Sequence, residues 1–570
     1  MVVLRWGFPG AVLLLILLGA LGAASLRAAN PPLALIIEHG RLVDGTGNPW
    51  RRADVGIREK KIVAIGDLAQ AQAARRIDAA DRVVCPGFID MHSHASWKLL
   101  VDGRAASKIT QGVTLEIEGE GFSIAPLDDA MVQRRREEYA RFGVDPSWRS
   151  LDDYFRRLER TPATVNFATY LGTENPREMF VGFDDRPATP DELERMRRLT
   201  QKAMEDGALG VFSALMYSPD RYNRTEELIE MAKVAARYGG VYQSHIRSES
   251  NAIDAALDEV FRIAREAKIP AQVTHLKVTY QQNWGRMPAI LERIEAARKA
   301  GLDITADLYP YVRAGGYFTP LLPPWAQEGG RPEIVRRLKD PATRERIKKE
   351  LATPTSAWEN EYYGAGGGPE GFSVTNAEGN PELKAYEGKT LAAIAKAEGK
   401  DPRDVVMDIV LAGDAGMTVL ITDEGDLRAA IQRPWVAFGT DGETVAPDGP
   451  LSAGFVHPRG YGTYPKVLGE YVRELGLLRL EDAVRKATSL PAQRLGIRDR
   501  GLLREGYYAD VVVFDSSKII DKATYERPHQ FGDGIAYVVV NGEVVLDRGR
   551  ITEARPGMVV RGPGHRSVVK

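Results

Sequence analysis

The sequence predicts an α/β fold: a (β/α)8 TIM-like barrel with a composite β-sandwich domain from both termini and an inserted subdomain after strand seven. Three observations lead to this prediction. Eight apolar, strand-like runs occur in the middle of the chain, and most are followed by an amphipathic helix pattern. Both ends of the chain are rich in short strands separated by turn residues. More than a hundred residues separate the seventh run from the eighth.

The first 29 residues form a segment of their own. Arg5 supplies a positive charge, and the run Ala11–Ala24 consists only of apolar and small residues. The run is short for a membrane span, whereas a charged start, an apolar stretch and small residues after it are typical of a secretory signal. We therefore expect residues 1–29 to be a signal peptide and the protein to be exported, to the periplasm or another extracytoplasmic location. The alternative is an uncleaved N-terminal anchor, which would be the protein's contact with a membrane.

The two termini are predicted to build one β-domain together. Residues 30–85 contain short strands, and residues 496–570 contain the strand-like runs Ala509–Phe514 and Tyr537–Leu546. The second run folds back at Asn541-Gly542, which is a strong hairpin signal. Neither end has enough strands to bury a sheet face alone, so we expect the two ends to pair with each other.

The barrel is predicted over residues 86–495. Its strands are Val83–His94, Val113–Gly121, Val165–Thr173, Ala208–Leu215, Gly240–Ile246, Ala271–Lys277, Asp303–Tyr311 and Trp435–Asp441. The predicted helix Thr225–Tyr238 is typical of the connections, because its apolar residues share one face and Gly239 suits its end. The interval after the seventh strand is too long for a loop, so we expect an inserted subdomain at about 318–430, over the barrel mouth.

Composition excludes several classes of function. The 570 residues include 76 basic and 78 acidic side chains without long runs of one sign, which argues against a nucleic-acid groove or a polybasic membrane surface. Cys85 is the only cysteine, so an intramolecular disulfide and a cysteine-rich zinc module are both excluded.

Four of the eight histidines lie near the ends of predicted barrel strands. His92 and His94 end the first strand, His245 the fifth and His275 the sixth, and Asp441 ends the eighth. Strand alternation turns His92 and His94 to one face, and catalytic groups gather at the C-terminal end of such barrels. Imidazole and carboxylate groups are ligands for Zn²⁺ and related ions. The sequence therefore predicts a metal site for one or two divalent ions, with Zn²⁺ as the expected metal.

The second strand supplies a candidate bridging carboxylate. Glu116, Glu118 and Glu120 share one alternation face, and buried charges on a barrel strand need a partner charge or a metal. Glu120 lies nearest the C-terminal end of the strand, so we place it between the two metals, with Glu118 as the alternative. The fourth strand contains no lysine, which rules out a site built on a carbamylated lysine of that strand.

These motifs resemble the amidohydrolase superfamily and, in their order and spacing, the N-acyl-D-amino-acid deacylases (D-aminoacylases). The matching segments include Pro86–His94, Ser244–Arg247, Thr274–Lys277, Asp307–Tyr311, His457–Arg459 and Ala509–Asp515. The resemblance implies metal-dependent hydrolysis of an amide bond. It also implies that Lys277, Arg459 and a tyrosine of the Tyr-Pro-Tyr segment, for which we choose Tyr311, hold a carboxylate of the substrate.

Two departures from the family pattern matter. The family has a metal-binding cysteine on strand two, where this chain has Glu120, and its His-Gly-Thr segment on strand three is replaced by Gly172–Asn175. A carboxylate in place of a thiolate favours two bridged divalent ions. The chemistry of the family is therefore expected to transfer to this chain more safely than the substrate.

The predicted reaction is deacylation of an N-acyl-D-amino acid, a small molecule with an amide and a free carboxylate. His92 and His94 are expected to bind one ion and His245 and His275 the second. Asp441 is expected to take a proton from the attacking water and deliver it to the leaving nitrogen. The alternatives are another amidohydrolase, such as a dipeptidase, a lactonase or a cyclic-amide hydrolase, and, more remotely, an exported binding protein on an inactive barrel.

Overall fold

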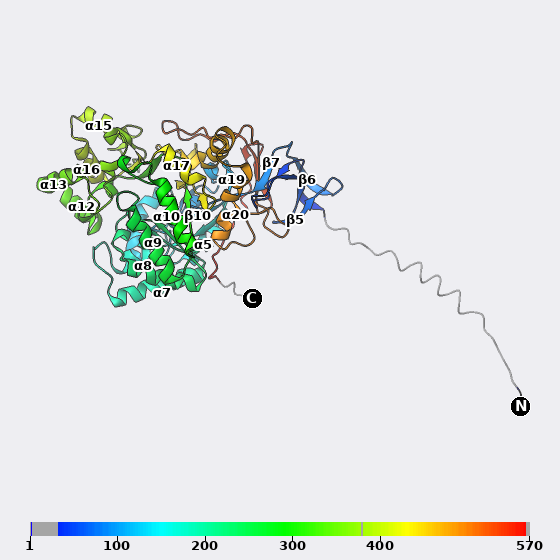
Figure 1. The fold of residues 1–570 in the computed structure, drawn as a ribbon, viewed down its shortest axis with the longest axis horizontal. Coiled ribbons are helices and arrows are strands. Elements are labelled where there is room, and N and C mark those ends of the chain that lie inside the picture. Colours follow the sequence, from blue (N-terminus) through cyan, green and yellow to red (C-terminus); the bar gives the residue numbers. More distant parts are fainter. Residues whose placement is uncertain (1, 3–31, 378–379, 566–570) are drawn as a thin grey trace.

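The computed structural model describes residues 2, 32–377 and 380–565, so the predicted signal peptide lies outside the described residues except for one position. A β-domain lies at one end of the molecule, the barrel lies in the middle, and the inserted subdomain lies at the other end (Figure 1). The helices labelled there in the subdomain are α12 (Gly330–Leu338), α13 (Pro341–Leu351), α15 (Leu391–Glu398) and α16 (Pro402–Ala412). Within the described residues, the structure has no helix that is both long and apolar enough to cross a membrane.

Both ends of the chain contribute to the β-domain, as predicted. Its strands are β1 (Leu33–Glu38), β2 (Arg41–Leu42), β3 (Arg51–Arg52), β4 (Asp54–Arg58), β5 (Lys61–Gly66), β6 (Ala73–Asp78), β7 (Val83–Pro86), β22 (Val511–Phe514), β23 (Ile535–Val540), β24 (Glu543–Asp547) and β25 (Arg550–Ile551). One sheet has the order β5-β4-β1-β6, and the other has the order β25-β24-β23-β22-β7-β2-β3. Strands β22 and β7 join the two ends of the chain, and apolar residues such as Ile37, Val55 and Val511 form a shared core.

The barrel consists of eight parallel strands in chain order. They are β8 (Phe88–Asp90), β10 (Val113–Glu118), β11 (Asn166–Thr169) with its continuation β12 (Leu171–Gly172), β13 (Gly210–Ala214), β14 (Val241–His245), β15 (Ala271–Val273), β16 (Ile304–Leu308) and β20 (Val436–Phe438). The ring closes where β21 (Gly442–Glu443) pairs with β9 (Ser93–His94) and Asp441 N donates to His92 O at 2.7 Å. The predicted barrel is therefore confirmed, and its closure joins the segment of the histidine pair to that of Asp441.

The predicted first strand is divided between two domains. Residues up to Pro86 belong to the β-domain, and residues from Phe88 onward belong to the barrel. Gly87 makes the transition, because a Cβ atom at this position would collide with the side chain of Thr114. The β-domain is thus connected directly to the strand that leads into the first two histidines.

Helices cover the outside of the barrel. They are α2 (Lys98–Val101), α3 (Ala106–Ile109), α4 (Asp129–Ala140), α5 (Leu151–Glu159), α6 (Glu174–Phe180), α7 (Pro190–Asp206), α8 (Thr225–Arg237), α9 (Ile253–Ala267), α10 (Met287–Lys299), α17 (Glu424–Ile431), α18 (Arg459–Lys466), α19 (Leu480–Ala487) and α20 (Ser489–Arg494). The apolar face predicted for α8 is buried, including Leu228, Met231 and Ala235. Burial of such faces against the strands provides the hydrophobic contribution that stabilises the barrel.

The inserted subdomain has a sheet and a hydrophobic core of its own. Its elements are β17 (Arg313–Tyr317), β18 (Phe372–Val374), β19 (Gly416–Leu420), α11 (Pro324–Gln327), α12 (Gly330–Leu338), α13 (Pro341–Leu351), α14 (Glu361–Gly364), α15 (Leu391–Glu398) and α16 (Pro402–Ala412). The sheet begins at Arg313 rather than at 318 and ends at Leu420, because β17 pairs antiparallel with β19. Residues such as Phe318, Phe372 and Val406 form the separate core.

The C-terminal segment 556–565 runs along the N-terminal ends of barrel strands, on the side opposite the metal-binding residues. Val560 N donates to Phe167 O at 2.8 Å, and Gly562 N donates to Gly207 O at 2.7 Å. Arg561 forms an ion pair with Asp152 of α5 at 3.0 Å. The segment therefore closes the lower face of the barrel and leaves the upper face for the site.

Candidate metal centre and active site

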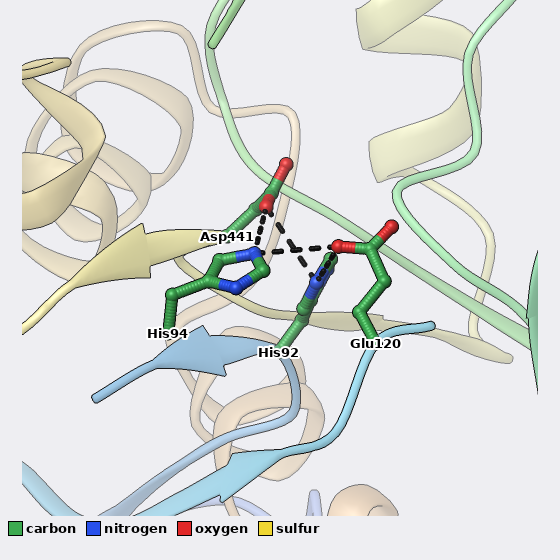
Figure 2. Close-up of side chains that lie close together, drawn as sticks. All are labelled: His92, His94, Glu120 and Asp441. Carbon is green, nitrogen blue, oxygen red and sulfur yellow. Dashed lines mark hydrogen bonds and ion pairs between the residues drawn. The ribbon is translucent and has the colours of Figure 1, made fainter. Parts of the chain in front are cut away.

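Two histidines and two carboxylates converge at the C-terminal ends of the barrel strands. Figure 2 shows His92 and His94 beside Glu120, which follows β10, and Asp441, which follows β20. His92 Nε2 lies 2.8 Å from Glu120 Oε2, and His94 Nε2 lies 2.9 Å from Asp441 Oδ1. One ligand atom from each of the four residues lies within 4.8 Å of the others, so the four could hold one metal ion.

A second group shares Glu120 with the first. His245 Nδ1 lies 2.9 Å from Glu120 Oε1, and His275 Nε2 lies 3.3 Å from the same oxygen. The other oxygen, Oε2, faces His92 and also lies 3.3 Å from His94. Glu120 therefore presents one oxygen to each group, which is the position that a carboxylate bridging two ions would occupy.

The other two glutamates of the second strand are held elsewhere. Glu118 accepts a hydrogen bond from the backbone N–H of Ser96, and Glu116 accepts one from the Thr444 hydroxyl at 3.0 Å. Burial raises the pKa of each carboxyl to about 7. Among the residues that the structure describes, Glu120 is the member of this trio that joins a potential metal group, so the alternative choice of Glu118 is not favoured.

Backbone strain accompanies two of the converging side chains. His275 and Asp441 have φ angles of +34° and +47°, in the left-handed region that non-glycine residues seldom adopt. Hydrogen bonds hold both positions: His275 N donates to Asp307 Oδ1 at 2.9 Å, and Asp441 N donates to His92 O. The chain turns sharply at the strand ends here, and the turns aim both side chains at the centre.

The electrostatics of the centre suit a divalent cation. Burial would raise the pKa of Glu120 and Asp441, but neighbouring histidines, and Arg459 for Asp441, outweigh burial and keep both values well below the ordinary range. Burial would lower the pKa of His94, but the bonds and charges of Asp441 and Glu120 raise it to about 10. Two buried imidazole nitrogens, His92 Nδ1 and His245 Nε2, have no hydrogen-bond partner among the residues that the structure describes. A set of nitrogen and oxygen donors in such a negative field fits Zn²⁺ and related ions.

A buried lysine, Lys108, which was not predicted as a site residue, connects the strand segments that carry the metal-binding residues. Lys108 Nζ donates to Asp90 at 2.9 Å, to Thr440 Oγ1 at 2.7 Å and to Gly442 O at 2.8 Å. Asp90 in turn accepts hydrogen bonds from the backbone N–H groups of Thr440 and His92. Lys108 thus holds the segments of the first and eighth strands together, and no local pattern in the sequence marks it.

Two of the predicted substrate-binding residues line the cavity above the centre. Arg459, at the start of α18, forms an ion pair with Asp441 in which Nη1 lies 2.6 Å from Oδ2, and it lies over the ring of Tyr309. Its buried Nε has no hydrogen-bond partner among the described residues. Lys277 donates to both Glu249 oxygens at 2.9 Å and lies 2.6 Å from His275 Nδ1. Arg459 and Lys277 are therefore each paired with a carboxylate of the site, and a substrate carboxylate would share Arg459 with Asp441.

The structure corrects the choice of Tyr311. Its hydroxyl donates to Asp521 at 3.3 Å, and Gly462 provides the room for it, because a Cβ atom there would collide with the hydroxyl. Tyr309 lines the cavity instead, and within the described part of the chain its buried hydroxyl has no hydrogen-bond partner. Tyr309 is therefore the tyrosine of this segment that can contact a substrate.

The cavity has a volume of about 340 Å³ and lies between the barrel and the inserted subdomain. Gly315 and Tyr317 of β17 and Met417 of β19 line its outer part. His457, which was not predicted as a site residue, links the inserted subdomain to the segment of Arg459. Its Nε2 donates to Arg313 O of β17 at 2.9 Å, and its Nδ1 accepts from Arg459 N at 3.0 Å. Burial, together with the charge of Arg459, keeps the pKa of His457 well below its ordinary value, so the ring is neutral.

Comparison with known proteins gives concordant matches over most of the chain. A sequence model of the amidohydrolase family matches residues 75–546. D-aminoacylase from Alcaligenes xylosoxydans xylosoxydans is 36% identical over 535 residues, which cover 94% of this chain and 99% of that protein. A solved D-aminoacylase, studied for its binuclear metal centre, superposes with a TM-score of 0.77 at 34% identity and covers 93% of this chain and 100% of its own.

N-acyl-D-glutamate deacylase from Bordetella bronchiseptica, solved with zinc and a phosphonate that mimics the tetrahedral intermediate, also has a TM-score of 0.77. It is 31% identical and covers 93% of this chain and 100% of its own. The resemblance noted in the motifs thus extends to the barrel, the β-domain and the inserted subdomain together. The chain belongs to the amidohydrolase family and, within it, to the D-aminoacylases, metal-dependent hydrolases of carbon–nitrogen bonds other than peptide bonds.

Proposed function

We propose that the protein deacylates N-acyl-D-amino acids. The observation that carries this proposal is the buried guanidinium of Arg459, which lines the cavity beside Asp441 and the metal-binding residues. A guanidinium fork has five N–H donors, so Arg459 can bind a substrate carboxylate as well as Asp441. The similarity to a D-aminoacylase and to an N-acyl-D-glutamate deacylase supports the D configuration.

The metal is proposed to be zinc, in a centre of two ions. His92, His94 and Asp441 would hold one ion, His245 and His275 would hold the second, and Glu120 would contact both. Divalent ions in such sites polarise the substrate carbonyl and lower the pKa of water. The donor set and the zinc and binuclear centres of the two solved relatives support this assignment.

The side chains of this chain supply the remaining functions. Asp441, held by its backbone hydrogen bond to His92, would take a proton from the attacking water and deliver it to the leaving nitrogen. Arg459 and Tyr309 lie on one side of the cavity, where they can orient the substrate's carboxylate. The inserted subdomain covers the mouth and limits the access of bulk water.

A substrate panel tests the proposed function. The zinc-reconstituted protein is incubated with N-acetyl-D-amino acids, their L enantiomers, a hydantoin and a lactone, and the release of free amino acid is measured. We expect turnover of the D compounds at a rate well above that of the L compounds. Turnover of the hydantoin or lactone, with none of the N-acyl amino acids, would replace the proposal with one of the alternative amidohydrolase activities.

Replacement of Arg459 by alanine is expected to lower kcat/KM for an N-acetyl-D-amino acid by about one to two orders of magnitude. A charge-assisted contact between guanidinium and carboxylate contributes about 1.5–3 kcal/mol, and about 1.4 kcal/mol corresponds to a factor of ten. Replacement by lysine should restore only part of the loss, because an ammonium group does not reproduce the planar fork.

The corresponding amino-acid amide is the internal control for Arg459. It lacks the anion, so its slower hydrolysis should be affected far less by either substitution. Equal losses for the acid and the amide would show that Arg459 has a structural role, for example in holding Asp441.

A further inference from the structure

The charges that line the cavity are not balanced within the protein. Its acidic residues are Glu120, Glu174, Glu249, Glu361, Asp441 and Glu443. Glu120 and Asp441 belong to the metal centre, Glu249 binds Lys277 with both oxygens, and Glu443 forms an ion pair with Lys98. Glu361 and Glu174 remain without an ion pair among the residues that the structure describes.

Glu361 is the more enclosed of the two. It is the first residue of α14 in the inserted subdomain, is 8% exposed and lines the cavity. Its carboxylate forms no hydrogen bond or ion pair with any described residue, and burial, together with the charges of Glu359 and Glu249, raises its pKa to about 8. Lys277 is the nearby cation that opposes this effect, but Glu249 already binds it. A cation next to Glu361 would therefore be stabilised strongly.

Glu174 lies at the start of α6, in the segment where the sequence departs from the family pattern. Burial, together with Glu178 and Asp220, raises its pKa to about 8. The charge of Arg135 opposes this effect, but the guanidinium lies 3.4 Å from the centre of the Phe122 ring and forms no ion pair with Glu174. Glu174 thus adds a second carboxylate to the cavity wall without adding its own counter-ion.

Arg459 and these two glutamates come from different parts of the fold. Glu174 follows the third barrel strand and Glu361 belongs to the inserted subdomain, whereas Arg459 follows the eighth strand. The charges that act on Arg459 are chiefly those of Asp441 and Glu120 of the metal centre, together with two tyrosines. The cavity therefore has an anion-binding side and a separate side with two carboxyl groups that lack a counter-ion among the described residues and that a bound cation would ionise.

We propose that the cavity selects N-acyl amino acids that also carry a primary ammonium or guanidinium group, with Glu361 as its principal partner and Glu174 as the second. The inference rests on the proposed function, because it presupposes that Arg459 receives the substrate's carboxylate. The complementary ligand is thus a molecule with a carboxylate at one end and a cation at the other. A volume of about 340 Å³ leaves room for a long side chain or a larger acyl group.

The cation could belong to either half of the substrate, and matched pairs distinguish the two sources. N-acetyl-D-lysine is compared with N-acetyl-D-2-aminoheptanoate, which replaces the side-chain ammonium by a methyl group. Glycyl-D-norleucine is compared with propionyl-D-norleucine, which makes the same change in the acyl group. We expect kcat/KM of the wild-type protein to be about 10- to 100-fold higher for the cationic member of at least one pair. This is the range that one charge-assisted hydrogen bond contributes.

Glu361→Gln keeps the shape of the side chain but removes its charge. The variant is expected to reduce the cationic preference to within about threefold of unity, and Glu174→Gln is expected to reduce it partly. Glu345→Gln is the matched control, because Glu345 lies in the inserted subdomain like Glu361, but its side chain is 73% exposed and forms an ion pair with Lys348 away from the cavity. That control should leave the preference unchanged.

A second measurement separates this inference from the proposed function. Thermal stabilisation by each compound reports binding without turnover, so it distinguishes cationic from neutral members even if no amide is cleaved. Efficient hydrolysis of both members of each pair, with equal stabilisation, would overturn the cationic preference and leave the deacylase proposal intact. A preference that survives in Glu361→Gln would overturn the assignment to Glu361.

Discussion

Replacement of Asp441 by asparagine is expected to lower kcat for an N-acetyl-D-amino acid by about 10²- to 10⁴-fold, which is the usual contribution of a positioned acid–base group. The amide keeps an oxygen near His94 but cannot accept the proton of the attacking water. The metal content, measured by atomic emission on the purified variant, should stay close to that of the wild type. The combination of retained metal and lost turnover is what identifies a proton-transfer role.

Asp448→Asn serves as the matched control for this experiment. Asp448 lies a few residues further along the chain, its side chain is 68% exposed, and it pairs with Arg104 rather than with the centre. Its substitution should leave both kcat and metal content unchanged. Near-wild-type rates for Asp441→Asn would remove the proton role, and a loss of metal without other change would make Asp441 chiefly a ligand.

Replacement of Glu120 by alanine is expected to remove at least one divalent ion and to weaken binding of the remaining ion by at least about 100-fold. Each oxygen of Glu120 faces a different pair of histidines, so both halves of the centre lose a ligand in one substitution. Two cations at a separation of roughly 3.5–4 Å would also lose the anion between them. Titration of the apoprotein with zinc, followed by calorimetry, measures both stoichiometry and affinity.

Glu118→Ala provides the comparison for Glu120. Because Glu118 accepts a hydrogen bond from Ser96 and faces no histidine pair, this variant should keep two ions per chain even if its thermal stability falls. If Glu118→Ala loses metal and Glu120→Ala keeps it, the bridging role belongs to Glu118.

Most of the metal centre could be predicted because parallel strands impose a common direction. The ends of β8, β14, β15 and β20 meet at one rim, so residues far apart in the chain, such as His92, His245 and Asp441, were predicted to converge from their strand positions. Alternation also singled out the glutamates of the second strand, and position along the strand favoured Glu120. The composite β-domain followed from the same reasoning, since neither terminus could bury a sheet alone.

The cavity walls could not be predicted in the same way, because they depend on contacts between distant elements. Tyr309 and Tyr311 occur in one short segment, and only the packing of Gly462 against Tyr311 decides which one reaches the cavity. Lys108 acts on Asp90 and on the eighth-strand segment through contacts without a sequence signature. Glu361 lies in the inserted subdomain, and no repeating pattern in the sequence indicates which of the subdomain's residues face the barrel.

The pairing of β7 with β22 has a consequence for how the chain reaches its folded state. Synthesis proceeds from the N-terminus, so β7 must wait for about 430 further residues before its partner exists. Assembly of the metal centre is delayed in the same way, because His94 and Asp441 are 347 positions apart in the chain. Contacts between such distant segments form slowly, since the loop between them must first be closed.

The first two histidines therefore spend most of synthesis on an incomplete barrel beside an unpaired strand. A centre that needs residues from both ends of the barrel cannot load two ions until the chain is nearly finished. Completion of the metal centre is thus a late event in the maturation of this protein, because a chain interrupted before Asp441 would have five of the six potential ligands but no eighth strand to close the barrel.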